Sequence, residues 1–300
     1  MTKPHWTGVF PAATTQFRRD QSLDLDATAR HLNALIESGV SGLIMCGSLG
    51  ENQTLDPEEK RQVVEMAVKT SSGRVPVLSG VAEMSTRAAC KYVQDCEKLG
   101  ADGFMVMPAM VYKSDATEAM THFRRVGEAT GLPWMLYNNP VGYTIDTTPQ
   151  QFAELSDIKN LVALKESSAD TRRITELRLE VGDRYAIFVG VDDLALEAAV
   201  LGIDGWVAGS GIAVPKENQY FWELTKAGKW DEAREMWKWF YPLMKLDTHI
   251  KFVQYIKLLV QEAGLGSEWV REPRLPLVGE ERERVMKVIR KGLENRPTLK

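Results

Sequence analysis

The sequence predicts a closed (β/α)8 barrel of the TIM type, followed by a C-terminal helical extension. Eight short apolar runs alternate with segments of helical periodicity, and only helical segments follow Pro215. Units of about 25 to 30 residues favour a closed barrel over an open Rossmann-like sheet, whose Gly-x-Gly-x-x-Gly motif does not follow the first run. We expect residues 1–228 to form the barrel and residues 229–300 to pack on it, within one structural unit.

The predicted strands are rich in Val, Ile, Leu and Met without clean polar alternation, which is typical of parallel strands covered on both faces. They span residues 8–14, 42–46, 75–80, 103–107, 133–137, 161–165, 185–190 and 205–209. Helical periodicity predicts helices at 24–38, 57–71 with Asp56 as N-cap, 85–99, 115–130 and 171–181. Further helices are expected at 216–227, 231–246, 250–263 and 280–293.

Composition and charge limit the classes of function. The chain has 37 Lys and Arg against 41 Asp and Glu, a net charge of −4 without long like-charge blocks, which disfavours a nucleic-acid or polybasic membrane surface. No stretch without a charge, residues 38–50 included, reaches the roughly 18 to 20 residues that span a bilayer. An odd number of cysteines without metal-type spacing fits a reducing compartment, so we expect a cytoplasmic protein.

A lysine ends the sixth apolar run, where barrel enzymes place catalytic residues. Ala163 and Lys165 share one face of the strand, and the small Ala163 leaves room inside the barrel. Burial lowers the pKa of a lysine, so its neutral amine can attack a carbonyl carbon. The alternative is that Lys165 points outward or pairs with Glu166.

Tyr137 ends the fifth run at the same offset from its start as Lys165 has in the sixth, so both are expected at similar height. Adjacent strands lie about 4.8 Å apart. The phenol could therefore carry protons to and from the amine or its adduct. The alternative is a core tyrosine with a satisfied hydroxyl.

The second run ends in Gly47-Ser48-Leu49-Gly50-Glu51. A glycine-flanked turn can aim successive backbone N–H groups and the Ser48 hydroxyl at an anion. Such loops are common, so the prediction depends on the combination with Lys165 and Tyr137. An amine, a proton shuttle and a carboxylate site together predict a Schiff-base enzyme for a small 2-oxo or imino acid.

Two more strand ends supply candidate substrate-binding residues, Gly190 and Ser210, whereas Asp192 is predicted to be a helix N-cap. A metal-dependent aldolase would need His, Asp or Glu at several strand ends. The histidines fall in the N-terminal segment or on predicted helices: His5, His31, His122 and His249. We expect neither a metal nor a cofactor. The aromatic cluster of the tail is expected to pack helix on helix: Trp237, Trp239, Phe240 and Tyr241.

Over residues 8–277 the chain resembles the class I Schiff-base lyases of the dihydrodipicolinate synthase and N-acetylneuraminate lyase family. The most specific segments are the loop at 47–51, where the family usually has Gly-[Thr/Ser]-[Thr/Ser]-Gly-Glu, Tyr137-Asn138-Asn139-Pro140, Leu164-Lys165-Glu166-Ser167 and Arg274-Leu275-Pro276-Leu277. The resemblance implies a barrel with a C-terminal helical cap, commonly a homotetramer. It also implies Lys165 as the Schiff-base residue, Tyr137 as proton shuttle, and Ser48 and the Leu49 amide as carboxylate ligands.

Three positions depart from that family. Leu49 replaces the second loop hydroxyl and cannot pass a proton. Pro108-Ala109-Met110 stands where an aromatic relay residue is expected after the fourth strand, and Tyr112 is the substitute that this sequence offers. Gly142 stands where dihydrodipicolinate synthase carries an arginine that binds the second substrate's carboxylate, which disfavours that reaction.

Among the subfamilies, the sequence along the whole chain is most similar to 1-pyrroline-4-hydroxy-2-carboxylate deaminase of hydroxyproline catabolism. The similarity includes Leu246-Asp247-Thr248-His249 and residues 264–269. This similarity implies attack of Lys165 on the C2 imine carbon, loss of the 4-hydroxyl through an enamine, and release of ammonia and 2-oxoglutarate semialdehyde. Three alternatives stay open. They are an aldolase or dehydratase of a 2-keto-3-deoxy sugar acid, a barrel that binds small acids without turnover, and a scaffold whose C-terminal helices form the main interaction surface.

Overall fold

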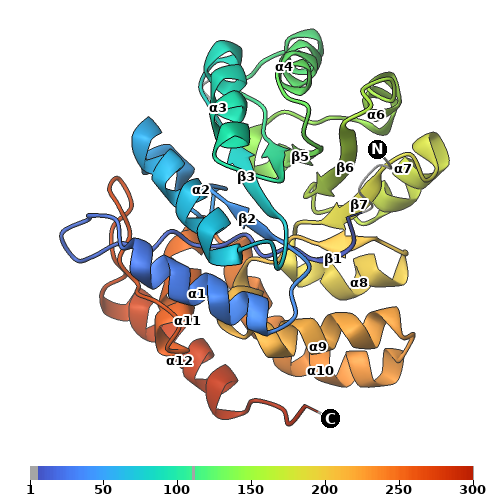
Figure 1. The fold of residues 1–300 in the computed structure, drawn as a ribbon. Helices are drawn as coiled ribbons and strands as arrows, with labels where there is room; N and C mark the ends of the chain where they lie inside the picture. The colour runs from blue at the N-terminus through green and yellow to red at the C-terminus, as the bar shows by residue number, and fades with distance from the viewer. Residues whose placement is uncertain (1–5, 110–111, 300) are drawn as a thin grey trace.

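The computed structural model describes residues 6–109 and 112–299, so His5 and Met110 lie outside the described residues. Eight parallel strands form one sheet in the order β1-β8-β7-β6-β5-β4-β3-β2. The sheet closes between β1 and β2, where the Ala13 N–H donates to the Ile44 carbonyl oxygen at 2.9 Å. The prediction of a (β/α)8 barrel is therefore confirmed, and Figure 1 shows helices surrounding the strands.

All eight predicted strands are present. Their bounds are β1 Gly8–Val9, β2 Leu43–Met45, β3 Val77–Val81, β4 Gly103–Val106, β5 Trp134–Asn138, β6 Leu161–Glu166, β7 Ala186–Val189 and β8 Gly205–Trp206. Every residue of these strands is buried, as the apolar runs without polar alternation predict. The first and last strands are shorter than the runs that predicted them, although Phe10 still donates its N–H to the Trp206 carbonyl oxygen.

The predicted helices are also present, within two residues of the expected bounds for the barrel helices. They are α1 Leu25–Glu37, α2 Pro57–Ser71, α3 Thr86–Lys98, α4 Ala116–Glu128, α7 Arg172–Val181, α9 Pro215–Lys226, α10 Trp230–Met244, α11 Phe252–Glu262 and α12 Gly279–Glu294. The sequence did not predict three short helices, because they have too few turns to show a period: α5 Pro140–Tyr143, α6 Pro149–Glu154 and α8 Ala195–Val200. Across the described residues, no helix is long and apolar enough to cross a membrane.

The C-terminal helices pack on the barrel through the aromatic cluster. In Figure 1, α9 to α12 gather along the lower side, in orange and red. Trp237 of α10 stacks on Phe221 of α9 with ring centroids 5.0 Å apart. Phe240 meets Trp206 of β8 edge-on at 6.1 Å. These residues therefore join α10 to both the neighbouring helix and the barrel wall.

A second attachment is a fully buried ion pair between α11 and the glycine loop. Nζ of Lys257 donates to Oε1 of Glu51 and to the Thr15 carbonyl oxygen, both at 2.9 Å. The other carboxylate oxygen of Glu51 accepts the Arg271 N–H at 3.1 Å. The Glu51 backbone is left-handed, with φ of 56°. The extension therefore fixes the loop that the sequence assigns to carboxylate binding.

Breaking this pair should destabilise the whole chain. In Lys257→Met the Glu51 carboxylate stays buried without its cation, so we expect the free energy of unfolding to fall by about 3 to 5 kcal/mol. Lys69→Met removes an exposed partner of Glu65 and should cost less than about 1 kcal/mol. Urea denaturation of both variants measures the difference, and equal losses would contradict a structural role for the buried pair.

Candidate active site

Lys165 lies inside the barrel beside Tyr137. The two residues are paired in register on β6 and β5. Nζ of Lys165 lies 3.9 Å from the centroid of the Tyr137 ring, and each residue is 6% exposed. Glu166 instead accepts the Ser168 N–H at 2.6 Å and an Asn138 Nδ2 hydrogen at 3.1 Å. The alternative in which Lys165 points outward or pairs with Glu166 is therefore wrong.

An irregularity between β5 and β6 sets this pairing. Trp134 pairs with Leu161, but the next residue, Met135, pairs with Ala163. Val162 is therefore an extra residue on β6, as in a β-bulge. The shift brings Tyr137 level with Lys165, and the prediction that both lie at the same height is confirmed.

Gly190 leaves the space that the lysine side chain occupies. A Cβ atom on Gly190 would stand 2.2 Å from Cε of Lys165 and 2.2 Å from Oγ of Ser167, closer than atoms can approach. Gly190 follows β7, and its N–H donates to the Glu166 carbonyl oxygen. The residue predicted to line the pocket thus borders the reactive side chain directly. A role in substrate binding stays a prediction.

Burial sets the protonation of both side chains. It lowers the pKa of Lys165, although negative charge on Tyr143, Asp247 and Asp192 opposes that shift. Burial also raises the pKa of Tyr137, while the hydrogen bond that Asn139 Nδ2 donates to its phenol oxygen at 3.0 Å acts in the opposite direction. The amine is therefore shifted toward its neutral, nucleophilic form and the phenol toward its protonated form.

Tyr143, which no sequence pattern singled out, lies in the same group. Its ring meets that of Tyr137 edge-on, with centroids 5.4 Å apart and an interplanar angle of 87°. Its hydroxyl forms a short hydrogen bond with Oγ of Ser48. A chain of polar groups therefore runs from the glycine loop through Tyr143 toward Tyr137 and Lys165.

The signal that could have revealed Tyr143 is a helix start. Asn139 caps α5 by accepting the Gly142 N–H on Oδ1 at 2.8 Å, and Pro140 occupies the first helical position. One helical turn then returns the chain toward β5 and places Tyr143 over Tyr137. The Asn139-Pro140 dipeptide indicates this turn in the sequence.

Tyr112 does not join this group within one chain. Its side chain is exposed at 56%, and among the described residues no hydrogen bond connects it with Tyr137 or Ser48. It precedes α4, whose N-cap is Asp115. Within the described residues, the hydroxyl that lies between Tyr137 and Ser48 is that of Tyr143, and the relay role predicted for Tyr112 stays a prediction.

The glycine loop keeps backbone donors available. Leu49 is buried, whereas Ser48 is half-buried. Within residues 6–109 and 112–299, neither the Ser48 N–H nor the Leu49 N–H donates a hydrogen bond. Two successive amides next to a serine hydroxyl can bind one carboxylate. The use of these groups by a substrate stays a prediction.

Asp192 is not the N-cap that the sequence predicted. Val191 precedes the short 3-10 helix η2 Asp192–Leu194, and Leu194 precedes α8. The buried Asp192 carboxylate instead accepts N–H groups at the end of β8: Trp206 Nε1 at 3.0 Å, Gly209 at 3.0 Å and Ser210 at 2.5 Å. The Asp192 carboxylate therefore accepts hydrogen bonds from the end of β8 and not from the first N–H groups of the following helix. Burial raises the pKa of Asp192 to about 6.

Ser210, the other predicted substrate-binding residue, begins the 3-10 helix η3 Ser210–Ala213 beside Asp192. It is fully buried, and its Oγ has no hydrogen-bond partner within the described residues. Contact with a substrate stays a prediction.

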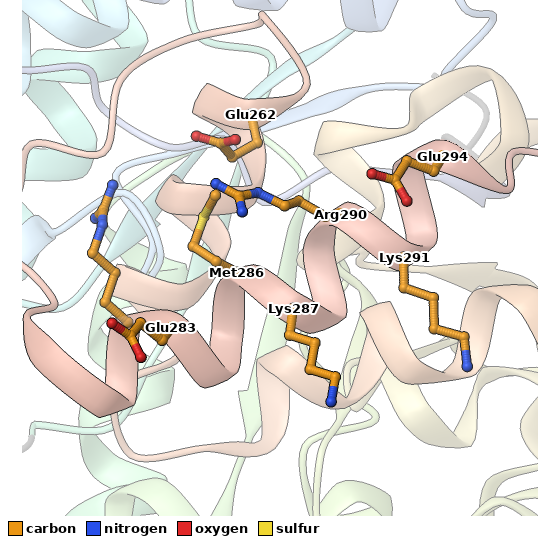
Figure 2. A pocket seen from close by; sticks show the side chains of 8 residues that line it. Glu262, Glu283, Met286, Lys287, Arg290, Lys291 and Glu294 are labelled. Carbon is orange, nitrogen blue, oxygen red and sulfur yellow. The ribbon is translucent and has the colours of Figure 1, made fainter.

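One groove of the described residues lies away from the strand ends. A groove of ≈ 630 Å³ lies along α12, lined by Glu262, Arg282, Glu283, Met286, Lys287, Arg290, Lys291 and Glu294. Figure 2 shows Lys287 and Lys291 extending to one side of the helix, away from Glu262. Side chains of both charges on an open helix face are typical of a solvated surface, so the strand ends locate the candidate site.

The described histidines lie apart from the strand ends: His31 in α1, His122 in α4, and His249 just before α11. His31 contacts the Ile212 carbonyl oxygen, and His122 contacts that of Met107. In the part of the chain that the structure describes, no three His, Cys, Asp or Glu side chains are grouped as metal ligands.

Comparison with known proteins identifies relatives along almost the whole chain. The model of the dihydrodipicolinate synthetase family matches residues 5–292. A 4-hydroxy-tetrahydrodipicolinate synthase from Phenylobacterium zucineum is 31% identical over 97% of this chain and 98% of its own. The structure of a dihydrodipicolinate synthase from Bacillus anthracis superposes with a TM-score of 0.91 at 27% identity, covering 97% and 99% of the two chains. A prophage protein of the same family from Escherichia coli, in complex with pyruvate, gives 0.89 at 25% identity, with coverage of 97% and 99%.

The hydroxyl of Tyr143 should matter for proton transfer but not for adduct formation. Tyr143→Phe keeps the ring contact with Tyr137 and removes the bond to Ser48. We expect deuterium exchange at the methyl group of pyruvate, followed by NMR in heavy water, to slow by roughly 10²-fold or more. The pyruvate adduct on Lys165 should still be trapped by borohydride. Tyr112→Phe should exchange at the wild-type rate, and equal slowing of both variants would contradict the assignment.

The lowered pKa of Lys165 also predicts a pH dependence. Only the neutral amine attacks a carbonyl carbon, so the rate of adduct formation with pyruvate should rise with pH and level off where Lys165 is deprotonated. Because burial lowers that pKa, the plateau should begin below 10.5. Mass spectrometry of adducts trapped after short incubations measures the profile. A rate that still rises above pH 10.5 would show an unshifted lysine.

Proposed function

The chain belongs to the dihydrodipicolinate synthetase family, and we propose that it deaminates 1-pyrroline-4-hydroxy-2-carboxylate through a Schiff base on Lys165. Members of this family are class I lyases that act on small keto acids. The observation that carries the proposal is the buried Lys165 amine in register with Tyr137, with free loop amides at the second strand end. The homotetramer that the family resemblance implies stays a prediction.

The substrate class follows from the groups around Lys165. The Ser48 hydroxyl and the Leu49 N–H can hold a carboxylate, which in a 2-oxo or 2-imino acid is bonded to the carbon that the amine attacks. The Escherichia coli relative in complex with pyruvate is consistent with such a ligand. In the proposed substrate, the ring C=N carbon is attacked by the amine in the same way as the ketone carbon of pyruvate.

The position of Gly142 argues against the reaction named for the relatives. Gly142 is exposed and has no side chain, so it offers no cation for the carboxylate of a second substrate. A deaminase needs only one organic substrate and water. The missing cation is therefore no obstacle to the proposed reaction.

The reaction balances with one net water. Lys165 attacks C2 of the ring imine and the bond from C2 to the ring nitrogen breaks, which leaves an amine on C5 and a Schiff base on C2. Loss of a C3 proton gives an enamine, whose electron pair expels the C4 hydroxyl as water. Proton transfers then move the unsaturation to the bond between C5 and nitrogen. Hydrolysis there releases ammonia, and hydrolysis at C2 frees 2-oxoglutarate semialdehyde and Lys165.

The residues around Lys165 match these steps. The Tyr137 phenol is level with the amine and can pass protons during imine exchange and at C3. Tyr143 and Ser48 connect that phenol with the loop, which compensates for the absence of a hydroxyl on Leu49.

The direct test is ammonia release from 1-pyrroline-4-hydroxy-2-carboxylate. Wild type should release ammonia, and Lys165→Ala at equal folded concentration should release none above background, because it has no nucleophile. Lys159→Ala, on the surface before β6, is the matched control and should keep full activity. Wild-type inactivity would exclude the deaminase and direct the search to 2-keto-3-deoxy acids. Full activity of Lys165→Ala would exclude the Schiff base.

A further inference from the structure

A carboxylate from the C-terminal extension reaches the end of β8, close enough to Lys165 for their charges to interact. Asp247 lies in the 3-10 helix η4 Lys245–Thr248, directly after α10. A Cβ atom on Gly209, just beyond β8, would stand 2.7 Å from Oδ1 of Asp247 and 3.1 Å from Oδ2 of Asp192. Two carboxylates from distant parts of the chain therefore lie against one glycine at the end of β8.

These two carboxylates differ in their bonding. Asp192 is fully buried and accepts three N–H groups of β8 and the residues after it. Asp247 is only partly buried, and across the described residues it forms no ion pair with a lysine, arginine or histidine. Asp192 is thus committed to the protein framework, whereas Asp247 keeps a carboxyl group available to a ligand.

The surroundings of Asp247 favour its protonated form. Burial is the largest cause that raises its pKa, followed by the negative charge of Asp192, so that the pKa stands well above its usual value. Positive charge on Lys165 acts in the opposite direction. The proton on Asp247 is therefore held while the lysine nitrogen is neutral and released more easily when that nitrogen becomes cationic.

We propose that Asp247 is a catalytic residue, the acid that protonates the hydroxyl leaving from C4 of the substrate. This inference rests on the proposed function. The nitrogen lone pair forms the C2=N bond, the C2=C3 electron pair becomes the second bond of a C3=C4 double bond, and the bond between C4 and oxygen breaks. The oxygen takes the Asp247 proton and leaves as water, so that the lysine nitrogen becomes an iminium cation and Asp247 a carboxylate. The new cation and the new anion appear together and stabilise each other.

The same assignment separates elimination from aldol cleavage. Aldol cleavage between C3 and C4 requires a base that removes the proton of the C4 hydroxyl. A protonated Asp247 cannot accept that proton, but it can donate its own. The extension therefore selects loss of water from the enamine over release of pyruvate.

The test compares Asp247→Asn with wild type on two leaving groups. With 1-pyrroline-4-hydroxy-2-carboxylate, ammonia release should fall by roughly 10²- to 10⁴-fold, as for loss of a general acid. With the 4-chloro analogue, the leaving group needs no proton, and the variant should stay within a few-fold of wild type. Borohydride trapping of pyruvate should be unchanged, which shows that the Lys165 site is folded. Asp231→Asn, at an exposed position of α10 in the same extension, is the matched control and should behave as wild type.

The outcomes are distinguishable from those of the proposed function. Equal ammonia release by Asp247→Asn and wild type would overturn the role of Asp247 and leave the deaminase intact. Equal losses with the hydroxy and chloro substrates, or loss of pyruvate trapping, would also overturn it, because they indicate a structural role. Absence of ammonia from wild type would overturn the deaminase and this inference together.

Discussion

The site depends on a lysine amine held away from water inside a parallel barrel. Transferring an ammonium group to this interior is costly, so burial favours the neutral amine. The neutral amine is the nucleophile. Gly190 gives the side chain room, and the Tyr137 ring covers it from the adjacent strand. Negative charge on nearby groups, among them the buried Asp192 carboxylate, limits the shift in pKa. The amine is therefore balanced between burial and nearby negative charge.

The extension contacts the barrel mouth at two places with opposite electrostatic character. At the glycine loop, Lys257 and Glu51 neutralise each other in a fully buried pair, which fixes backbone geometry and offers nothing to a ligand. At the end of β8, Asp247 stands beside Asp192 without a cation to pair with in the described residues. The first contact stabilises the fold, and the second leaves the Asp247 carboxyl group able to exchange a proton with a substrate. Two elements of the extension, α11 and η4, thus contribute in different ways to the site.

The barrel, its strands and the positions of Lys165 and Tyr137 could be predicted because they depend on local patterns. Strand ends are marked by apolar runs, and equal offsets within two runs placed the two side chains level. That success included an element of register that no pattern displays, the extra residue Val162 on β6. The expectation for Asp192 was wrong because a local cap competes with donors from another strand, and sequence proximity reveals only the local option.

Tyr143 and Asp247 could not be placed for related reasons. Tyr143 depends on a four-residue helix, too short for a periodic signal. The position of Asp247 depends on how the helical tail packs on the barrel, through the aromatic contacts of Trp237 with α9 and of Phe240 with β8. Residues placed by local patterns could be predicted, whereas contacts between distant segments could not.

The placement of Asp247 on the extension has a consequence for divergence among such barrels. The nucleophile belongs to a strand whose every neighbour constrains it, so substitutions there are rarely tolerated. Residue 247 belongs to a short connecting segment between two helices, where replacement disturbs little of the core. Descendants of one ancestor could therefore retain the covalent intermediate and change which of its bonds breaks, simply by altering this connection. New reactions would then arise from changes in this connecting segment, while formation of the Schiff base on the strand lysine is retained.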